Sequence, residues 1–416
     1  MGPLSHVLGA PIGVREDRIL ARGHGYWVLT ESHGFKLLKS SVVRTIAVGV
    51  ACLFSLQAGV ACRSSSRIQP PGQPETGPGG SNYAHAQITA QRFGEGDSEC
   101  WLFTPDVPRP TEAPVVVFVH GWSATDPYLY GAWIRHLVRR GNIVVYPRYQ
   151  KNFRTRLDDM TPNALGAVQA AMHRLEHYGP VHPAQDLFGL VGHSMGGFIA
   201  ANLAALAVKN GLPHPRVLMV VEPGDGENRM PRLGKRLSLA DSSSVSSEML
   251  FLIVTGDADT VVGERGAEKI WKALRTIPSA NKNYVTVRSD RRPFPRLIAD
   301  HLSPLAVDRT FPVAPSTMDG VGPGPKRSNC PIGFLARLLE ARRARIRHRV
   351  HRRWAGRFPP DTLDYYGYWR LFDGLLDAAF HGAPKPSALV KAPDSQSMGT
   401  CSDGSPVHPL MVKSQP

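Results

Sequence analysis

The chain has 416 residues, of which 42% are hydrophobic and 20% are charged, a composition typical of globular rather than disordered proteins. Its formal net charge is +15, but nine arginines against one glutamate lie between Arg337 and Arg357, and this stretch supplies about half of the excess. The remainder is only mildly basic, which argues against a nucleic-acid-binding domain that covers the whole chain.

The first 61 residues are predicted to be an N-terminal extension that ends in a signal peptide. A basic segment, 36–44, precedes an apolar run, 45–56, and Gly59-Val60-Ala61 offers small residues for cleavage. The apolar run is too short to span a membrane comfortably. We therefore expect an exported protein, which is periplasmic, on the cell surface or secreted. Cleavage before Cys62 would also suit a lipid anchor, although Gly59 stands where leucine is normally expected.

Residues 62–84 are rich in Ser, Pro, Gly and Gln and are predicted to form a disordered linker before a core domain at 85–305. Within the core, apolar runs alternate with helical patterns. Strands are expected at 115–119, 142–146, 187–191, 217–221, 250–255 and 284–287, and helices at 130–140, 162–178, 195–209 and 264–274. Near-continuous apolar strands that alternate with helices indicate an α/β fold, with a mostly parallel sheet and helices on both faces.

Two segments depart from this alternation. Residues 222–248 form a long polar excursion between two strands, where a lid could lie. Residues 306–416 are predicted to be a C-terminal extension, in which the arginine-rich stretch 337–357 has apolar residues at roughly helical spacing. Such a basic amphipathic helix would either contact an anionic membrane surface or pack one face on the domain. A final helix is expected at 371–380, either packed on the sheet or beside an acyl pocket.

The segment Gly192-His193-Ser194-Met195-Gly196 has the G-x-S-x-G pattern, between an apolar strand and a helix. This is the context of a nucleophile elbow, in which a tight turn holds the serine in a strained conformation with its hydroxyl above the sheet. Glycines are needed because a Cβ would clash with the neighbouring backbone. The pattern predicts Ser194 as a nucleophile, with His193 packed beside it.

A second motif, Val119-His120-Gly121-Trp122, ends the valine-rich strand at 115–119. Acyl transfer develops an oxyanion that needs two hydrogen-bond donors. The backbone N–H groups of Trp122 and Met195 are the expected donors. His120 is expected to orient this loop.

These two motifs together resemble the α/β-hydrolase superfamily, especially its esterase and lipase-like branch, over roughly residues 87–304. The resemblance implies the α/β-hydrolase fold and a triad that runs Ser, acid, His along the chain. The acid turn of that family resembles Thr255-Gly256-Asp257-Ala258-Asp259, and its second acidic position is Asp259. Asp257 is the nearest competitor, and Glu222 or Asp225 are further alternatives because some relatives place the acid after the preceding strand.

The histidine must follow the acid turn and the next strand, and His301 satisfies both conditions. An imidazole titrates near neutrality, so it can take the serine proton and return it to the leaving group. His348 and His351 lie in the arginine-rich stretch, where positive charge would oppose an imidazolium. His381 and His408 come late and lack a preceding strand.

Together these residues predict a serine hydrolase that cleaves a small-molecule carboxylic ester or lipid through an acyl-enzyme. A peptidase, amidase or thioesterase on the same triad, or a non-catalytic surface-attached binding protein, stays open. No metal is expected, because no cysteine or histidine cluster has metal-ligand spacing. No cofactor is expected either, since the chain has no P-loop or dinucleotide fingerprint, and no nucleic-acid partner is expected because most of the chain is only mildly basic. Which two of Cys100, Cys330 and Cys401 would form a disulfide also stays open.

Overall fold

The computed structural model describes residues 67–152, 155–226, 236–308, 310–311 and 358–413. The expected signal peptide within 1–61, Cys62 and the expected amphipathic helix at 337–357 lie outside the described residues, so these stay predictions. Cys330 lies outside them too, whereas Cys100 and Cys401 are buried free thiols. None of the helices in the described part is long and apolar enough to span a membrane.

Nine strands form one sheet in the order β1-β2-β4-β3-β5-β6-β7-β8-β9. The six strands from β4 to β8 in this order pair in parallel, and the strands at both edges pair antiparallel. The strands are β1 (Gln87–Phe93), β2 (Cys100–Asp106), β3 (Glu112–Val119), β4 (Ile143–Pro147), β5 (His182–His193), β6 (Val217–Val221), β7 (Leu250–Gly256), β8 (Lys282–Val287) and β9 (Met411–Lys413).

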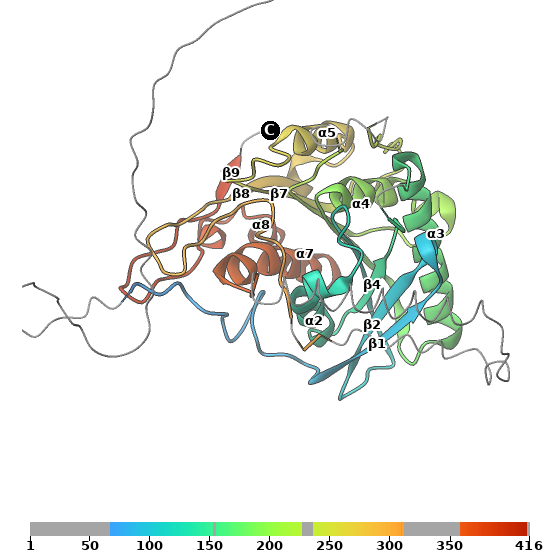
Figure 1. The fold of residues 1–416 in the computed structure, drawn as a ribbon, viewed down its shortest axis with the longest axis horizontal. Coiled ribbons are helices and arrows are strands. Elements are labelled where there is room, and N and C mark those ends of the chain that lie inside the picture. Colours follow the sequence, from blue (N-terminus) through green and yellow to red (C-terminus); the bar gives the residue numbers. More distant parts are fainter. Residues whose placement is uncertain (1–66, 153–154, 227–235, 309, 312–357, 414–416) are drawn as a thin grey trace, which may run out of the picture. The chain divides into compact units, whose positions relative to one another are not determined.

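Helices cover both faces of this sheet (Figure 1). One face packs against α3, α4 and α5, and the other against α2, α7 and α8. The helices are α2 (Gly131–Arg139), α3 (Leu157–Tyr178), α4 (Met195–Leu206), α5 (Arg265–Ala273), α7 (Arg370–His381) and α8 (Lys385–Ala388). Short helical turns are η1 (Gly96–Ser98), η2 (Pro127–Tyr130), η3 (Val208–Asn210), η5 (Ser279–Asn281) and η7 (Pro393–Gln396), and the π-helical η6 (Leu363–Trp369) precedes α7. The expected α/β fold is therefore confirmed.

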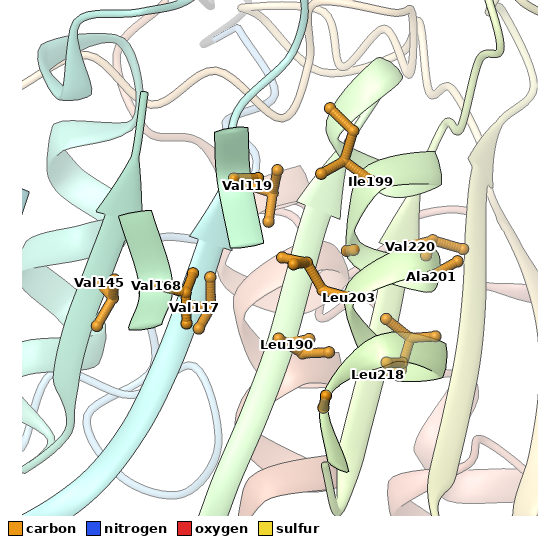
Figure 2. Packing of buried hydrophobic residues seen from close by; sticks show 14 of the residues in the cluster. Val117, Val119, Val145, Val168, Leu190, Ile199, Ala201, Leu203, Leu218 and Val220 are labelled. Carbon is orange, nitrogen blue, oxygen red and sulfur yellow. The ribbon is translucent and has the colours of Figure 1, made fainter. Parts of the chain in front are cut away.

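The alternation of side chains along β3 explains why both faces are apolar. Val117 and Val119 point into the core beneath α3 and α4, whereas Val116 and Phe118 point into the core beneath α2 and α7. Figure 2 shows the first of these cores, where Val117 and Val119 lie near α3 and α4. Each fully buried side chain of this kind contributes about 1.5–3 kcal/mol. Two apolar faces thus hold the carboxyl ends of the strands in place.

Residues 67–84, which were expected to belong to a disordered linker, lie on the domain. The carbonyl of Pro71 accepts a hydrogen bond from the Thr362 hydroxyl at 2.6 Å, and the N–H of Gly79 donates to Asp373 at 2.7 Å. The carbonyl of Ile68 accepts from the N–H of Phe294 at 2.8 Å. The prolines and glycines of this segment form turns whose polar backbone groups find partners on the domain, so its composition does not lead to disorder here.

Asp373 of α7 joins this N-terminal segment to α2. Its fully buried carboxylate accepts from His136 at 2.8 Å and from Gly79, and it lies 3.2 Å from Nε of Arg140. Burial acts to raise the pKa of Asp373, but His136, Arg140 and the Gly79 N–H outweigh it and hold the pKa below its ordinary value. The carboxylate is therefore charged and paired in the interior.

We expect Asp373→Ala to lower the free energy of unfolding by roughly 3–5 kcal/mol, because Arg140 loses a buried anion and the donors of His136 and Gly79 lose their acceptor. Asp377→Ala is the matched control. Asp377 lies one turn later on α7 and its half-exposed carboxylate pairs with the same Arg140 at 3.2 Å. That loss is expected to be below about 1 kcal/mol. Urea unfolding measures both, and equal effects would contradict the buried role of Asp373.

The same experiment has a pH signature. Because the folded-state pKa of Asp373 is depressed, its stabilisation is complete above the unfolded carboxyl pKa, about 3.9, and is lost as the pH falls through the lower folded value. The difference in the free energy of unfolding between wild type and Asp373→Ala should therefore shrink as the pH falls below about 3.9.

Candidate active site

Ser194 occupies a strained turn between β5 and α4. Its φ of 57° and ψ of −125° lie outside the regions that non-glycine residues favour. The N–H of Ser194 donates to Val221 of β6 at 2.9 Å, and its carbonyl accepts from Gly197 at 2.9 Å. Ser194 is partly exposed among buried neighbours, so its side chain stands at the carboxyl end of the parallel strands.

Steric crowding makes two glycines necessary at this turn. A Cβ on Gly192 would lie 2.2 Å from the carbonyl oxygen of Gly196. A Cβ on Gly196 would lie 2.2 Å from the carbonyl oxygen of Val119, at the end of β3. Both contacts involve backbone atoms that cannot rotate away. Only glycine lets the turn approach β3 this closely.

Three of the predicted site residues meet in space. The Nε2 atom of His301 lies 3.0 Å from Oγ of Ser194, and its Nδ1 atom lies 2.9 Å from Oδ2 of Asp259. A carboxylate only accepts hydrogen bonds, so we assign the proton to Nδ1. Nε2 is then the acceptor that faces the serine hydroxyl. The three side chains come from the ends of β5 and β7 and from the segment after β8. They place the imidazole where Nε2 can take the serine proton while the carboxylate accepts from Nδ1.

The surroundings of Asp259 favour its charged form. Its Oδ1 atom accepts from the N–H groups of Val261 at 2.7 Å and Val262 at 3.2 Å. Burial acts to raise the pKa of Asp259, but the hydrogen bond to His301 and these two N–H groups outweigh it and hold the pKa below its ordinary value.

The three alternative acids lie in different surroundings. Asp257 accepts from the N–H and hydroxyl of Ser289, and Asp225 pairs with Lys269. Glu222 alone among them approaches the imidazole: its Oε2 lies 3.6 Å from Nδ1 of His301. That separation is too long for a hydrogen bond, unlike the 2.9 Å contact of Asp259.

Glu222 is fully buried at the end of β6, with a φ of 46°. Burial raises the pKa of its carboxyl well above the ordinary value, and the nearby charge of Asp259 adds to the shift. Two carboxyl groups therefore flank His301 with opposite tendencies, since the surroundings of Asp259 favour its ionised form and those of Glu222 favour its neutral form.

The loop after β3, which holds the expected oxyanion donor Trp122, is fixed on both sides of that residue. The N–H of Gly121 donates to the Tyr130 hydroxyl at 3.0 Å, and the N–H of Ser123 donates to Gln150 at 2.7 Å. A Cβ on Gly121 would lie 3.4 Å from the Cβ of Ser194, so the loop passes directly beside the serine.

The second expected donor, Met195, is the first residue of α4. The first N–H groups of a helix have no acceptor within it, and the helix dipole favours negative charge there. The structure thus places the loop that holds Trp122 beside Ser194 and the first residue of α4, Met195, directly after it. No oxyanion is present in it, so their role as donors stays a prediction.

The two central histidines are neutral and buried. His120 donates from Nδ1 to the carbonyl of Gly121 at 2.7 Å and stacks on Tyr149, with ring centroids 4.2 Å apart. Burial lowers the pKa of His120 to about 3. Burial and the neighbouring His301 lower the pKa of His193 to about 3 as well. His193 contacts the carbonyl of His301 at 3.0 Å and Tyr130 at 2.8 Å.

The remaining histidines have other positions. His381 ends α7, and His408 contacts the carbonyl of Ser289 through Nδ1 at 2.8 Å. His348 and His351 lie outside the described residues. Tyr130 was not identified in the sequence as a site residue, because nothing in its local pattern, at the end of η2, indicates contact with a residue 63 positions away.

Within the described ranges, His193, Glu222 and His301 form a group whose ligand atoms lie within 4.8 Å of one another, as in a metal site. Their nitrogens already have partners, however. Both ring nitrogens of His301 contact Ser194 and Asp259, and Nε2 of His193 contacts the backbone of His301. A metal ion there would replace these bonds, so the arrangement suits proton transfer better than metal binding.

Comparisons with known proteins agree with this geometry at the level of a family. The profile of the chlorophyllase family, an α/β-hydrolase-like esterase family, matches residues 95–266, which is less than half of the chain. A search of curated protein sequences found no match.

Two solved structures are similar to the chain. Carboxyl esterase 2 from the mycorrhizal fungus Tuber melanosporum has 18% identity and a TM-score of 0.39, with 58% of this chain and 87% of that chain covered. An esterase from the fungus Rhizomucor miehei has 14% identity and a TM-score of 0.36, with 50% of this chain and 76% of that chain covered.

We expect Gly192→Ala to destabilise the protein by at least about 2 kcal/mol, because the new methyl group overlaps fixed backbone. It should also slow the labelling of Ser194 by a fluorophosphonate by roughly 100-fold, since a displacement of about 1 Å at a reacting atom has that effect. Gly166→Ala on α3 is the control. A Cβ there meets nothing within 4 Å, and the change should stabilise the helix by about 0.5–1 kcal/mol. Similar behaviour of the two variants would contradict the steric role of Gly192.

Proposed function

We propose that the chain is a serine hydrolase of carboxylic esters, which its mostly parallel sheet and the match of residues 95–266 to an α/β-hydrolase-like esterase family support. In this proposal Ser194 is the nucleophile, His301 the general base and Asp259 the acid. The observation that carries it is the unbroken path of hydrogen bonds, 3.0 Å from Ser194 to His301 and 2.9 Å from His301 to Asp259.

The proposed reaction has two steps. His301 removes the proton of Ser194 through Nε2 while the serine oxygen attacks the ester carbonyl, and Asp259 stabilises the imidazolium through Nδ1. The N–H groups of Trp122 and Met195 hold the developing oxyanion. His301 then gives its proton to the departing alcohol. Water, activated by the same imidazole, releases the acid from the acyl-enzyme and restores Ser194.

A small-molecule ester or lipid is favoured over an amide or thioester because the matched family is a family of esterases. The same triad can also run as a peptidase, amidase or thioesterase. A panel of short esters, long esters, thioesters and aminoacyl amides would separate these classes. A non-catalytic binding protein has no need of a serine, an imidazole and an ionised carboxylate in hydrogen-bonding sequence, and this favours an enzyme.

We expect Ser194→Ala to lose ester hydrolysis by roughly 10⁴- to 10⁶-fold in kcat while it keeps the wild-type unfolding transition. His301→Ala should lose a similar factor, because the serine then has no base. The check is an ester assay combined with fluorophosphonate labelling and mass spectrometry of the labelled peptide. Labelling at another serine, or full activity in Ser194→Ala, would refute the proposal.

A second test separates the two carboxyl groups beside His301. Asp259→Asn should lower kcat by roughly 10⁴-fold, because an amide in that place favours the wrong imidazole tautomer. Glu222→Gln should lower it by less than about 10-fold, because Glu222 lies 3.6 Å from Nδ1 of His301, burial favours its neutral form and the amide has the same shape. Steady-state kinetics on purified variants measure both. The reverse order of effects would make Glu222 the acid.

A further inference from the structure

A path of three hydrogen bonds connects the oxyanion loop with the segment that carries His301. The N–H of Gly121 donates to the Tyr130 hydroxyl at 3.0 Å. The Tyr130 hydroxyl lies 2.8 Å from Nδ1 of His193, and Nε2 of His193 lies 3.0 Å from the carbonyl oxygen of His301. The hydrogen bonds that join Ser194, His301 and Asp259 are not among its three bonds.

Each bond of this path has one possible direction. The carbonyl oxygen of His301 can only accept, so Nε2 of His193 carries a proton. His193 is neutral, because burial and the neighbouring His301 lower its pKa to about 3, and its Nδ1 therefore accepts. Tyr130 must then donate to His193, which leaves its oxygen to accept from the N–H of Gly121. The path has no alternative arrangement that satisfies every group.

The path is also buried and tightly packed. Tyr130 is 0% exposed and His193 is 3% exposed. A Cβ on Gly121 would lie 3.1 Å from Nδ1 of His193 and 3.2 Å from the Tyr130 oxygen, so the loop backbone rests directly on both groups. Buried polar groups lose water on folding, and an apolar pair of similar shape would fill the space without that loss. A directional network, in contrast, fixes relative positions to a few tenths of an ångström.

We propose that Tyr130 and His193 are positioning residues, which hold the oxyanion loop and the backbone of His301 in one rigid frame on either side of Ser194. This inference rests on the proposed serine hydrolase function. The frame sets the distance between the oxyanion donors and the base, which matters most when the tetrahedral transition state forms. Loss of the frame therefore lowers kcat and the affinity for a tetrahedral analogue much more than it alters KM.

Tyr130→Phe is the first test, because it removes one hydroxyl and keeps the ring. The N–H of Gly121 and Nδ1 of His193 then both lack a partner. We expect kcat to fall roughly 10- to 100-fold and KM to change by less than about 3-fold. The affinity for an alkyl boronic acid, which forms a tetrahedral adduct with the serine, should fall by the same factor as kcat/KM.

Substitutions of His193 test each bond separately. In His193→Gln the amide nitrogen can replace Nε2 and donate to His301, and in His193→Asn the amide oxygen can replace Nδ1 and accept from Tyr130. Both should retain more activity than His193→Phe, which can make neither bond. The double variant Tyr130→Phe with His193→Phe should be no slower than His193→Phe alone, because residues that act as one unit are not additive.

Tyr284→Phe is the matched control, since Tyr284 is a fully buried tyrosine on β8 that takes no part in the path. It should keep the wild-type kcat. All rates are normalised to the sites that fluorophosphonate titrates, so that misfolded protein does not count. Wild-type kcat per titrated site in Tyr130→Phe and His193→Phe would overturn the inference, whether KM stays the same or rises enough to account for the whole fall in kcat/KM.

The two proposals fail in different ways. Absence of ester hydrolysis and of Ser194 labelling in the wild-type protein would refute the serine hydrolase, and the positioning role with it. An active, labelled wild type whose Tyr130 and His193 variants are equally active would refute the positioning role alone.

Discussion

The site depends on a serine backbone that is held in a conformation it would not adopt by itself. Ser194 has a φ of 57°, and strain of this kind costs about 1–3 kcal/mol. The packing of β5 against β3 and β6, and of α4 on the sheet, compensates for it. Gly192 and Gly196 allow the close approach, because any Cβ would overlap backbone oxygens at 2.2 Å. The packing of the apolar core and the two glycines thus together hold the Ser194 hydroxyl in its strained position.

The same frame sets the charges around His301. Asp259 accepts hydrogen bonds from the imidazole and from two backbone N–H groups, and these favour its ionised form. Glu222 lies 3.6 Å from the same ring and is buried without comparable donors, which favours its neutral form. Differences in solvation and hydrogen bonding thus shift the pKa values of two similar carboxyl groups in opposite directions. These opposite tendencies favour a single anion beside the imidazole, which limits repulsion between the two acids.

A second set of buried hydrogen bonds, outside the triad, connects the loops of the site. Tyr130 and His193 connect the loop after β3 with the segment after β8, and both are neutral and buried. In the proposed reaction, charge develops on the substrate oxygen and on His301 together. A frame that holds both places before substrate arrives avoids reorganisation during the reaction, which is the main advantage of a preorganised site.

The strands of the sheet differ in how far their sequences predict them. The six parallel strands are buried on both faces, so their apolar runs are evident, and each was predicted within a few residues except β5, which begins five residues before its predicted start. The antiparallel strands β1, β2 and β9 were missed. β1 is mostly half-buried with a mixed composition, and β9 has three residues, so neither has a clear pattern. α3 begins at Leu157, before Pro162, because Asp158 and Asp159 suit a helix N-terminus.

The sequence by itself determined which side chains stand at the ends of the core strands, because glycine sterics and strand burial are local properties. The glycine pattern between a strand and a helix therefore predicted the turn at Ser194. Asp259 and His301 were identified from the resemblance to the α/β-hydrolase superfamily, and the role of all three in catalysis stays a proposal. Only the tertiary structure decided that Asp259 rather than Glu222 lies within hydrogen-bonding distance of His301. It also decided that Tyr130 meets His193, and that residues 67–84 rest on α7. These contacts join segments that are far apart in the sequence. The distances between their atoms depend on how the helices pack on the sheet, and a local sequence pattern does not determine that packing.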